Sequence, residues 1–106
     1  MSEIQNMEVK FEDGDSGRVI SLTGALVIHQ AGRIHAQLLS ALENAGPCQV
    51  DLHGVTEIDT AGVQILIALL HEAKLRSQAI TLTRFHPSIL PALELFELTR
   101  YLGAVA

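Results

Sequence analysis

Residues 50–69 read VDLHGVTEIDTAGVQILIAL, and this stretch decides the fold of the chain. Its first residues have the pattern of a strand that is buried in the middle of a sheet, and the apolar run from Val63 onward is typical of a helix. Asp-Thr-Ala-Gly, at residues 59–62, supplies small and polar residues at the junction between the two. A buried strand that passes directly into a helix predicts a partly parallel sheet with helices packed against it.

The chain on either side continues the alternation of strand and helix patterns. Around the turn cluster EDGDSG, apolar and polar side chains alternate, which predicts a hairpin. The expected elements are strands at residues 7–11, 18–26, 49–55 and 79–84, and helices at residues 28–45, 60–76 and 88–98, with a final turn from Thr99. We therefore expect an α/β fold: a single domain over residues 1–106, with a mixed, partly parallel four-stranded sheet packed with three to four helices.

Composition restricts the class of protein. Of 106 residues, 48% are hydrophobic and 18% are charged, which is enough apolar material for one core. A single cysteine, Cys48, cannot form an internal disulfide, which favours a cytoplasmic protein. The longest apolar run, residues 65–70, is far shorter than the roughly 20 residues of a membrane span, and the N-terminus lacks a secretory signal pattern. The net charge of −5, without a basic cluster, argues against nucleic acid as a partner.

Catalytic and metal sites are not expected either. The five histidines include no pair at metal-ligand spacing, and no H-E-x-x-H motif occurs. Glycine-rich phosphate loops are absent, and Cys48 has no basic neighbour in the sequence that would activate it as a nucleophile. The sequence therefore predicts no enzyme, no metal and no cofactor.

The helix from Thr60 onward is apolar on two sides, whereas one side would suffice to pack it on a sheet. With residues placed about 100° apart, Val63, Leu66 and Leu70 lie on the side assigned to the core. The other apolar side, which has a polar rim, contains Ala61, Ile65, Ala68, Leu69 and Leu75. Because monomers seldom expose such a patch, we expect a protein-docking surface there; cover by the C-terminal helix or the N-terminal segment is the alternative.

These motifs resemble the signature of STAS domains, the sulfate transporter and anti-sigma factor antagonist group. In that family a strand of the type L-D-L-S-G-V leads through F-I-D-S-S-G-L into a helix, as residues 50–69 do here. Gly24 with Leu26 fits the turn after the family's second strand, and LELFELTRYL, residues 93–102, is similar to its closing motif. The resemblance implies a non-enzymatic module that docks on a protein partner through the junction and the helix that follows.

The junction departs from the family pattern at its two serines. Thr60 takes the place of the first serine, and Ala61 takes the place of the second, which in anti-anti-sigma members is the residue that an anti-sigma kinase phosphorylates. Without a hydroxyl at Ala61, the usual phosphoserine switch is missing. We expect Thr60 to cap the helix through its hydroxyl, with phosphorylation of Thr60 as the alternative role. Asp59 suits a helix N-terminus, and Gly62 allows a close backbone approach.

The form D-T-A-G leaves two kinds of partner open. It resembles STAS domains of bacterial signalling, whose partner would be an anti-sigma kinase-like or chemosensory protein. It also resembles the cytosolic STAS subunit of phospholipid-trafficking ABC transporters, which binds the ATPase. A second copy of the chain, in a weak homodimer, is a further candidate partner. The expected partner-binding residues are Asp59, Thr60, Ala61, Gly62, Gln64, Ile65, Ala68 and Leu69.

Overall fold

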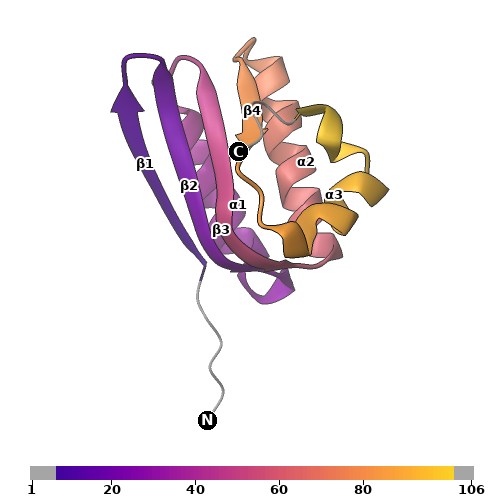
Figure 1. Cartoon of the computed structure of the whole chain (residues 1–106). Helices are drawn as coiled ribbons and strands as arrows, with labels where there is room; N and C mark the ends of the chain where they lie inside the picture. The colour runs from indigo at the N-terminus through magenta and orange to yellow at the C-terminus, as the bar shows by residue number, and fades with distance from the viewer. Residues whose placement is uncertain (1–6, 102–106) are drawn as a thin grey trace.

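The computed structural model describes residues 7–101. Its centre is a mixed four-stranded sheet. The strands, which lie side by side in chain order, are β1 (Glu8–Gly14), β2 (Gly17–Leu26), β3 (Cys48–Ile58) and β4 (Ile80–Thr83) (Figure 1). β1 pairs with β2 in antiparallel orientation, and the pairs β2–β3 and β3–β4 are parallel. The predicted hairpin and the predicted partly parallel sheet are both confirmed.

Helical segments connect the parallel strands and follow β4. They are η1 (Ile28–Gln30), α1 (Ala31–Leu42), α2 (Thr60–Leu75), η2 (Pro87–Ile89), α3 (Leu90–Leu95) and η3 (Leu98–Tyr101). The η segments are single 3-10 turns, so the described part of the chain has three α-helices, as expected. Leu102, which ends the closing motif named above, lies outside the described residues. None of the described helices has the length and apolar character that a membrane span requires.

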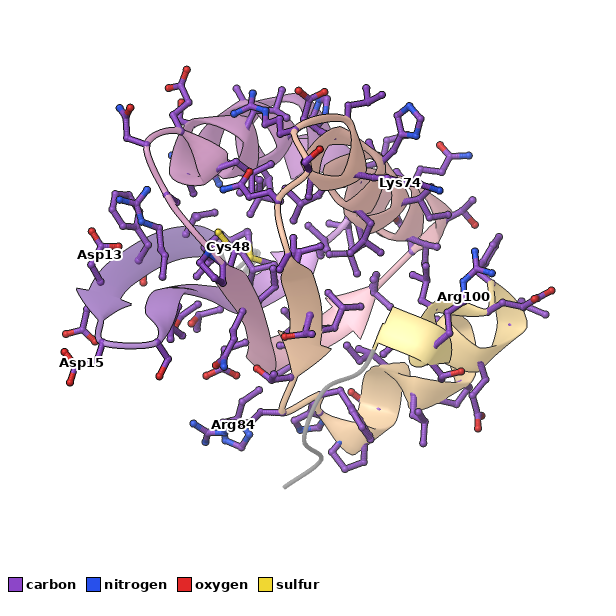
Figure 2. The ribbon with its side chains drawn as sticks, turned by 90° about the horizontal axis from the view of Figure 1, so that it is seen from above. Asp13, Asp15, Cys48, Lys74, Arg84 and Arg100 are labelled. Atoms are coloured by element: carbon purple, nitrogen blue, oxygen red, sulfur yellow. The ribbon has the colours of Figure 1, made fainter. Side chains whose placement is uncertain are left out.

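One face of the sheet is buried and the other is exposed, because side chains alternate along each strand. In β2, Ile20 and Leu22 are fully buried, whereas Val19 and Thr23 on either side of them are exposed and Ser21 between them is half-buried. The central strand β3 repeats the pattern with its buried residues Val50, Leu52 and Val55. Both α1 and α2 lie on the buried face, as the view from above shows (Figure 2).

The two apolar sides of α2 reflect this arrangement. α2 packs on the sheet with one side and against α1 with the other. Leu66 and Leu69, which the sequence assigned to different sides, are both 0% exposed, and Ile65 is 6% exposed. The expectation that Ile65 and Leu69 face outward is therefore wrong, because α1 lies alongside and covers that side. Neither the C-terminal helix nor the N-terminal segment is needed to explain the apolar excess of α2.

After β4 the chain crosses to the far end of β3. The Ser88 hydroxyl donates a hydrogen bond of 2.9 Å to the backbone oxygen of Thr56, and the Ser88 backbone nitrogen donates to Nδ1 of His86. These bonds fix η2 beside the end of β3. Farther along, η3 lies against β4. The C-terminal segment therefore borders the β4 edge of the sheet and leaves the β1 edge at the opposite side.

Candidate functional site

The carboxyl ends of β2 and β3 bring two chain connections together, because the strands are parallel and Leu26 pairs with Ile58. One connection runs from β2 into η1 and α1, and the other runs from β3 into α2. Asp59 lies between β3 and α2 and is the N-cap of α2, with extended backbone angles of −112° and −175°. The junction predicted from the sequence is thus at the edge where ligand and partner sites of parallel sheets commonly form.

Asp59 joins the two connections through both of its carboxylate oxygens. Oδ1 accepts a hydrogen bond of 2.9 Å from the backbone nitrogen of Gly62, which caps the first turn of α2. Oδ2 accepts a hydrogen bond of 3.0 Å from the backbone nitrogen of Ile28 in η1. The backbone nitrogen of Asp59 also donates to Leu26 at 3.3 Å. The Asp59 side chain therefore fixes the geometry of the junction, because both of its oxygens accept hydrogen bonds from backbone nitrogens.

Gly62 is required by a close approach of two backbones. A Cβ atom at this position would lie 2.1 Å from the backbone oxygen of Leu26 and 2.8 Å from Cγ1 of Ile58. Real Cβ atoms do not occupy such positions, and a backbone oxygen cannot move aside as a flexible side chain can. The structure thus has the close backbone approach that the sequence led us to expect, and Gly62 is buried beneath the junction.

Thr60 is the first residue of α2, and it is exposed. The expectation that its hydroxyl caps the helix is wrong, since Asp59 holds the N-cap position and Thr60 already lies within the helix. Both residue types can cap a helix, and the extended backbone of Asp59 decides between them. Among residues 7–101 the Thr60 hydroxyl has no hydrogen-bond partner. It is available to solvent or to another molecule.

A shallow depression of about 270 Å³ runs between α1 and α2 beside Thr60. Its lining consists of Gly32, His35, Ala61, Gln64, Ile65 and Ala68. Ala61 and Ala68 are half-buried, Gln64 is exposed, and Ile65 forms part of the floor. We define the junction surface as this lining together with Thr60 and Ile28. The lining of the depression contains no aspartate, glutamate, lysine or arginine. The half-buried carboxylate of Asp59 precedes Thr60, and both of its oxygens are hydrogen-bonded to backbone nitrogens.

Ile28 is a member of the junction surface that the sequence reasoning missed. The sequence pattern predicts Ile28 as the first residue of the helix expected at residues 28–45, yet Ile28 is 65% exposed. Its position follows from the parallel pairing of β2 and β3, which brings the segment that follows β2 beside the start of α2. The rule that carboxyl ends of parallel strands meet at one edge could have found it.

The partner-binding residues predicted from the sequence therefore differ in how deeply they are buried. Thr60, Ala61, Gln64 and Ala68 come together at the surface. Asp59 and Gly62 hold the backbone beneath them, through hydrogen bonds and close packing. Leu69 is completely buried and cannot reach another molecule in this fold.

Within the described chain, no cluster of three or more histidine, cysteine, aspartate or glutamate side chains could hold a metal ion. Burial raises the pKa of the Cys48 thiol, which makes the thiolate scarcer at neutral pH. A larger hollow of about 760 Å³ lies between α2, β4 and η3, on the side where Figure 2 labels Lys74 and Arg100. It shares no lining residue with the junction surface.

Comparisons with known proteins bear on the fold and the family. A family model described as "Mlab, STAS domain" matches residues 9–104. The anti-sigma factor antagonist SpoIIAA in its unphosphorylated form has a TM-score of 0.75 and 18% sequence identity, with 93% of this chain and 88% of that chain covered. An anti-sigma factor antagonist from Mycobacterium paratuberculosis has a TM-score of 0.80 and 17% identity, with 94% and 85% covered.

A transporter protein also has this fold. A sulfate transporter family protein from Wolinella succinogenes has a TM-score of 0.66 and 20% identity, with 80% of this chain and 70% of that chain covered. Comparison of the sequence with curated proteins gives no significant match. At these identities the structural matches establish the fold alone, and the family rests on the model that spans almost the whole chain.

Proposed function

Because the chain belongs to the family described as "Mlab, STAS domain", we propose that it is a non-enzymatic docking protein that binds a bacterial partner protein through the junction surface. The observation that carries this proposal is the depression beside the first turn of α2, whose lining contains no aspartate, glutamate, lysine or arginine. There Thr60 and Gln64 are exposed, and the 65% exposed Ile28 is held nearby, because its backbone nitrogen donates to Asp59, the N-cap of α2. A lining without such charged side chains can be desolvated at low cost when a partner covers it.

Preorganisation supports the same proposal. Asp59 ties the backbone of Ile28 to the start of α2, and Gly62 lets that turn press against Leu26. A surface whose backbone is already fixed loses little conformational entropy on binding. The side chains of Ala61 and Ala68 are small and leave room in the depression between α1 and α2, so that a side chain of the partner can enter it.

Regulation by the usual phosphoserine is absent from this proposal. Ala61 stands where the family's phosphate acceptor would be, and alanine has no hydroxyl. The junction surface therefore stays competent for docking unless Thr60 is modified. The exposure of Thr60 and its unengaged hydroxyl favour it as the residue on which a phosphate would act.

The first candidate partner is an anti-sigma kinase-like or chemosensory protein of bacterial signalling. The anti-sigma factor antagonists among the structural neighbours support this choice, since they have the same fold over nearly the whole chain. Such a partner would place the protein in the cytoplasm. The junction surface would then act as a reversible contact in a signalling pathway.

The second candidate partner is the ATPase of a phospholipid-trafficking ABC transporter. The sulfate transporter family protein among the neighbours favours keeping this candidate, because it associates the fold with transport as well as with signalling. In this case the same junction surface would bind the ATPase at the inner face of the membrane. The two candidates differ in the partner and share the docking residues.

Site-specific cross-linking tests the surface and the partner together. A photoreactive residue in place of Gln64 should cross-link one protein in native cells, which mass spectrometry identifies as a kinase-like or chemosensory protein or as an ABC ATPase. The matched control carries the same residue in place of His53, which is exposed on β3. We expect no cross-link to that protein from the control position.

Affinity measurements with the identified partner then test the chemistry of the contact. Ala61→Asp puts a charge into the depression and should weaken binding at least about tenfold, because that charge must be desolvated. Ala61→Ser should bind nearly as well as the wild type and restores a phosphate acceptor. Equal affinity of the wild type and a folded Ala61→Asp variant would show that the partner binds elsewhere.

A further inference from the structure

β1 presents an open edge at one side of the sheet. In the order β1-β2-β3-β4, β1 is paired with β2 on one side, and no described strand lies on its other side (Figure 1). The opposite edge belongs to β4, which spans only Ile80–Thr83 and is bordered by η3. Open edges offer unpaired backbone groups to another strand. The seven residues of β1, Glu8–Gly14, are therefore the main unpaired edge of the described chain.

The side chains of β1 divide between the two faces of the sheet. Phe11 pairs with the buried Ile20 of β2 and so lies on the helix-covered face. Lys10 and Glu12 flank it and lie on the exposed face. In an antiparallel pair of two identical strands, residues directly opposite each other share a face, and a two-fold axis passes through one residue pair. The sequence of β1 then determines which charges meet.

One two-fold register makes the charges complementary. If Phe11 pairs with Phe11 of a second copy, Lys10 stands opposite Glu12 of that copy, and Glu12 stands opposite its Lys10. Two opposite-charge pairs then flank a central aromatic pair, and both kinds of cross-strand pair are stabilising. A shift to a centre at Lys10 or at Glu12 would place like charges opposite each other, which is destabilising.

The remaining complementary register is centred on Val9, and it conflicts with the start of the strand. It would pair Phe11 with Met7 of the second copy. Met7 is 1% exposed, and its backbone oxygen already accepts a hydrogen bond of 2.9 Å from Arg33 on α1. The register centred on Phe11 pairs only residues within β1. Of the two registers with complementary charges, it is the one that is compatible with the buried Met7.

Phe11 also suits the centre of a contact between copies. Its ring is 50% exposed, although the guanidinium of Arg18 lies 4.1 Å from the ring centroid. Arg18 is itself held by Asp13 and by the backbone oxygen of Ala41, so the ring rests on a fixed support. Beside it is a depression of about 330 Å³, lined by Val9, Phe11, Ala36, Gln37 and Ser40, which gives room for the second ring.

We infer that the protein forms a two-fold homodimer in which β1 pairs with β1 of a second copy in the register centred on Phe11. The two sheets then run on as one sheet, with a Lys10–Glu12 pair on each side of the axis. None of the residues in this contact belongs to the junction surface. The dimer consequently leaves both junction surfaces free, and the inference stands whether or not the docking proposal is correct.

Sedimentation equilibrium over a wide range of protein concentrations tests the dimer. The wild type should behave as a reversible dimer. Lys10→Glu and Glu12→Lys should each raise the dissociation constant of the dimer at least about tenfold, because each creates like-charge pairs across the axis. The double variant Lys10→Glu, Glu12→Lys should restore the dimer, since it exchanges the two charges. Lys74→Glu on α2, the matched control, should leave the dissociation constant unchanged.

Thermal melting of each variant at low concentration tests the fold of the monomer, which we expect every variant to retain. A wild-type protein that stays monomeric at every concentration would overturn the inference. So would a dimer that tolerates either single reversal, because another surface would then hold it together. A double variant that stays as weak as the single variants would exclude the register centred on Phe11, and with it the inference.

Discussion

The carboxylate of Asp59 accepts a hydrogen bond of 3.0 Å from the backbone nitrogen of Ile28, although 31 residues separate the two in the chain. The other carboxylate oxygen caps α2 through Gly62. One side chain thus connects the segment after β2 to the helix after β3. The geometry of the junction surface depends on this connection, whereas the hydrophobic core does not.

Replacement of Asp59 should therefore loosen the junction without unfolding the domain. We expect Asp59→Ala to lower the free energy of unfolding by about 1–2 kcal/mol, as loss of a helix cap does. Asp59→Asn should lie between this variant and the wild type, because its amide retains only one oxygen acceptor. Urea unfolding measures the stability, and hydrogen exchange at the amides of Ile28 and Gly62 locates the change. Unaltered exchange at both amides in Asp59→Ala would contradict the connection.

A pair of glycine variants tests the close approach beneath the junction. Gly62→Ala should cost about 1–3 kcal/mol or more, because its Cβ would collide with the backbone oxygen of Leu26, which cannot move aside. Gly32→Ala is the matched control in α1, where an added Cβ meets no atom within 4 Å. That variant should be as stable as the wild type or more stable by up to about 1 kcal/mol. Equal melting temperatures for the two variants would refute the assignment of Gly62.

Three leucines of α2 distinguish its buried sides from its exposed end. Leu66→Ala and Leu69→Ala should each cost about 2–5 kcal/mol, since both side chains are 0% exposed. Leu75→Ala, the matched control, removes a side chain that is 68% exposed and should cost less than about 0.5 kcal/mol. Chemical denaturation of the three variants gives these values. If Leu69→Ala resembled Leu75→Ala, the side of α2 that faces α1 would not be closely packed.

The sequence sufficed for the order of strands and helices, because periods of two and of 3.6 residues are local properties. It could not predict what covers the second side of α2. Spacing along one helix shows that Ile65 and Leu69 share a side, but the neighbour on that side is α1, some thirty residues earlier in the chain. Only the arrangement of both crossover helices on one face of the sheet explains their burial.

The sequence predicted the position of the junction correctly, but it predicted the wrong capping residue. Asp59 and Thr60 can both cap a helix, so residue type alone does not choose between them. The choice depends on which residue retains extended backbone angles, and Asp59 does so while also reaching Ile28. The role of Gly62 was easier to predict. Glycine is unfavourable in the first turn of a helix, and a close backbone approach is one of the few physical reasons to find it there.

Acid should weaken the ion pair between Asp13 and Arg18. The hydrogen bond from Arg18, at 2.6 Å, and the nearby positive charge hold the pKa of Asp13 below its ordinary value, although desolvation opposes this shift. A carboxyl group with a lowered pKa stabilises the fold above its unfolded-state pKa, and this contribution disappears as the pH falls through the folded-state pKa. The stabilisation is therefore complete at neutral pH and is lost below about pH 4.

The pH dependence can be isolated with Asp13→Asn. At neutral pH this variant should be less stable than the wild type, because it lacks the charge that faces Arg18. The difference in the free energy of unfolding should shrink as the pH falls, since the wild-type carboxyl group becomes neutral too. Urea unfolding at several pH values measures it. A difference that stays constant down to the acid limit would mean that the ion pair contributes nothing.

Thr60 is the residue at which a negative charge should affect docking and spare the fold. It is exposed at the N-terminal end of α2, where an anionic side chain interacts favourably with the helix dipole by about 0.3–1 kcal/mol. Thr60→Glu should therefore melt at the wild-type temperature or slightly above it. The same charge would lie beside the depression, whose lining contains no aspartate, glutamate, lysine or arginine, so binding of the cross-linked partner should weaken at least about tenfold.

Thr60→Val is the matched control, because it keeps the branched shape and removes only the hydroxyl. It should bind the partner as the wild type does, and it should accept no phosphate at position 60 from a cognate kinase. Wild-type protein treated with that kinase should carry its phosphate on Thr60, since Ala61 has no acceptor oxygen. Phosphate found mainly on Ser88, or full partner binding by Thr60→Glu, would remove Thr60 from the regulation of docking, because charge at the first turn of α2 would then have no effect on the contact.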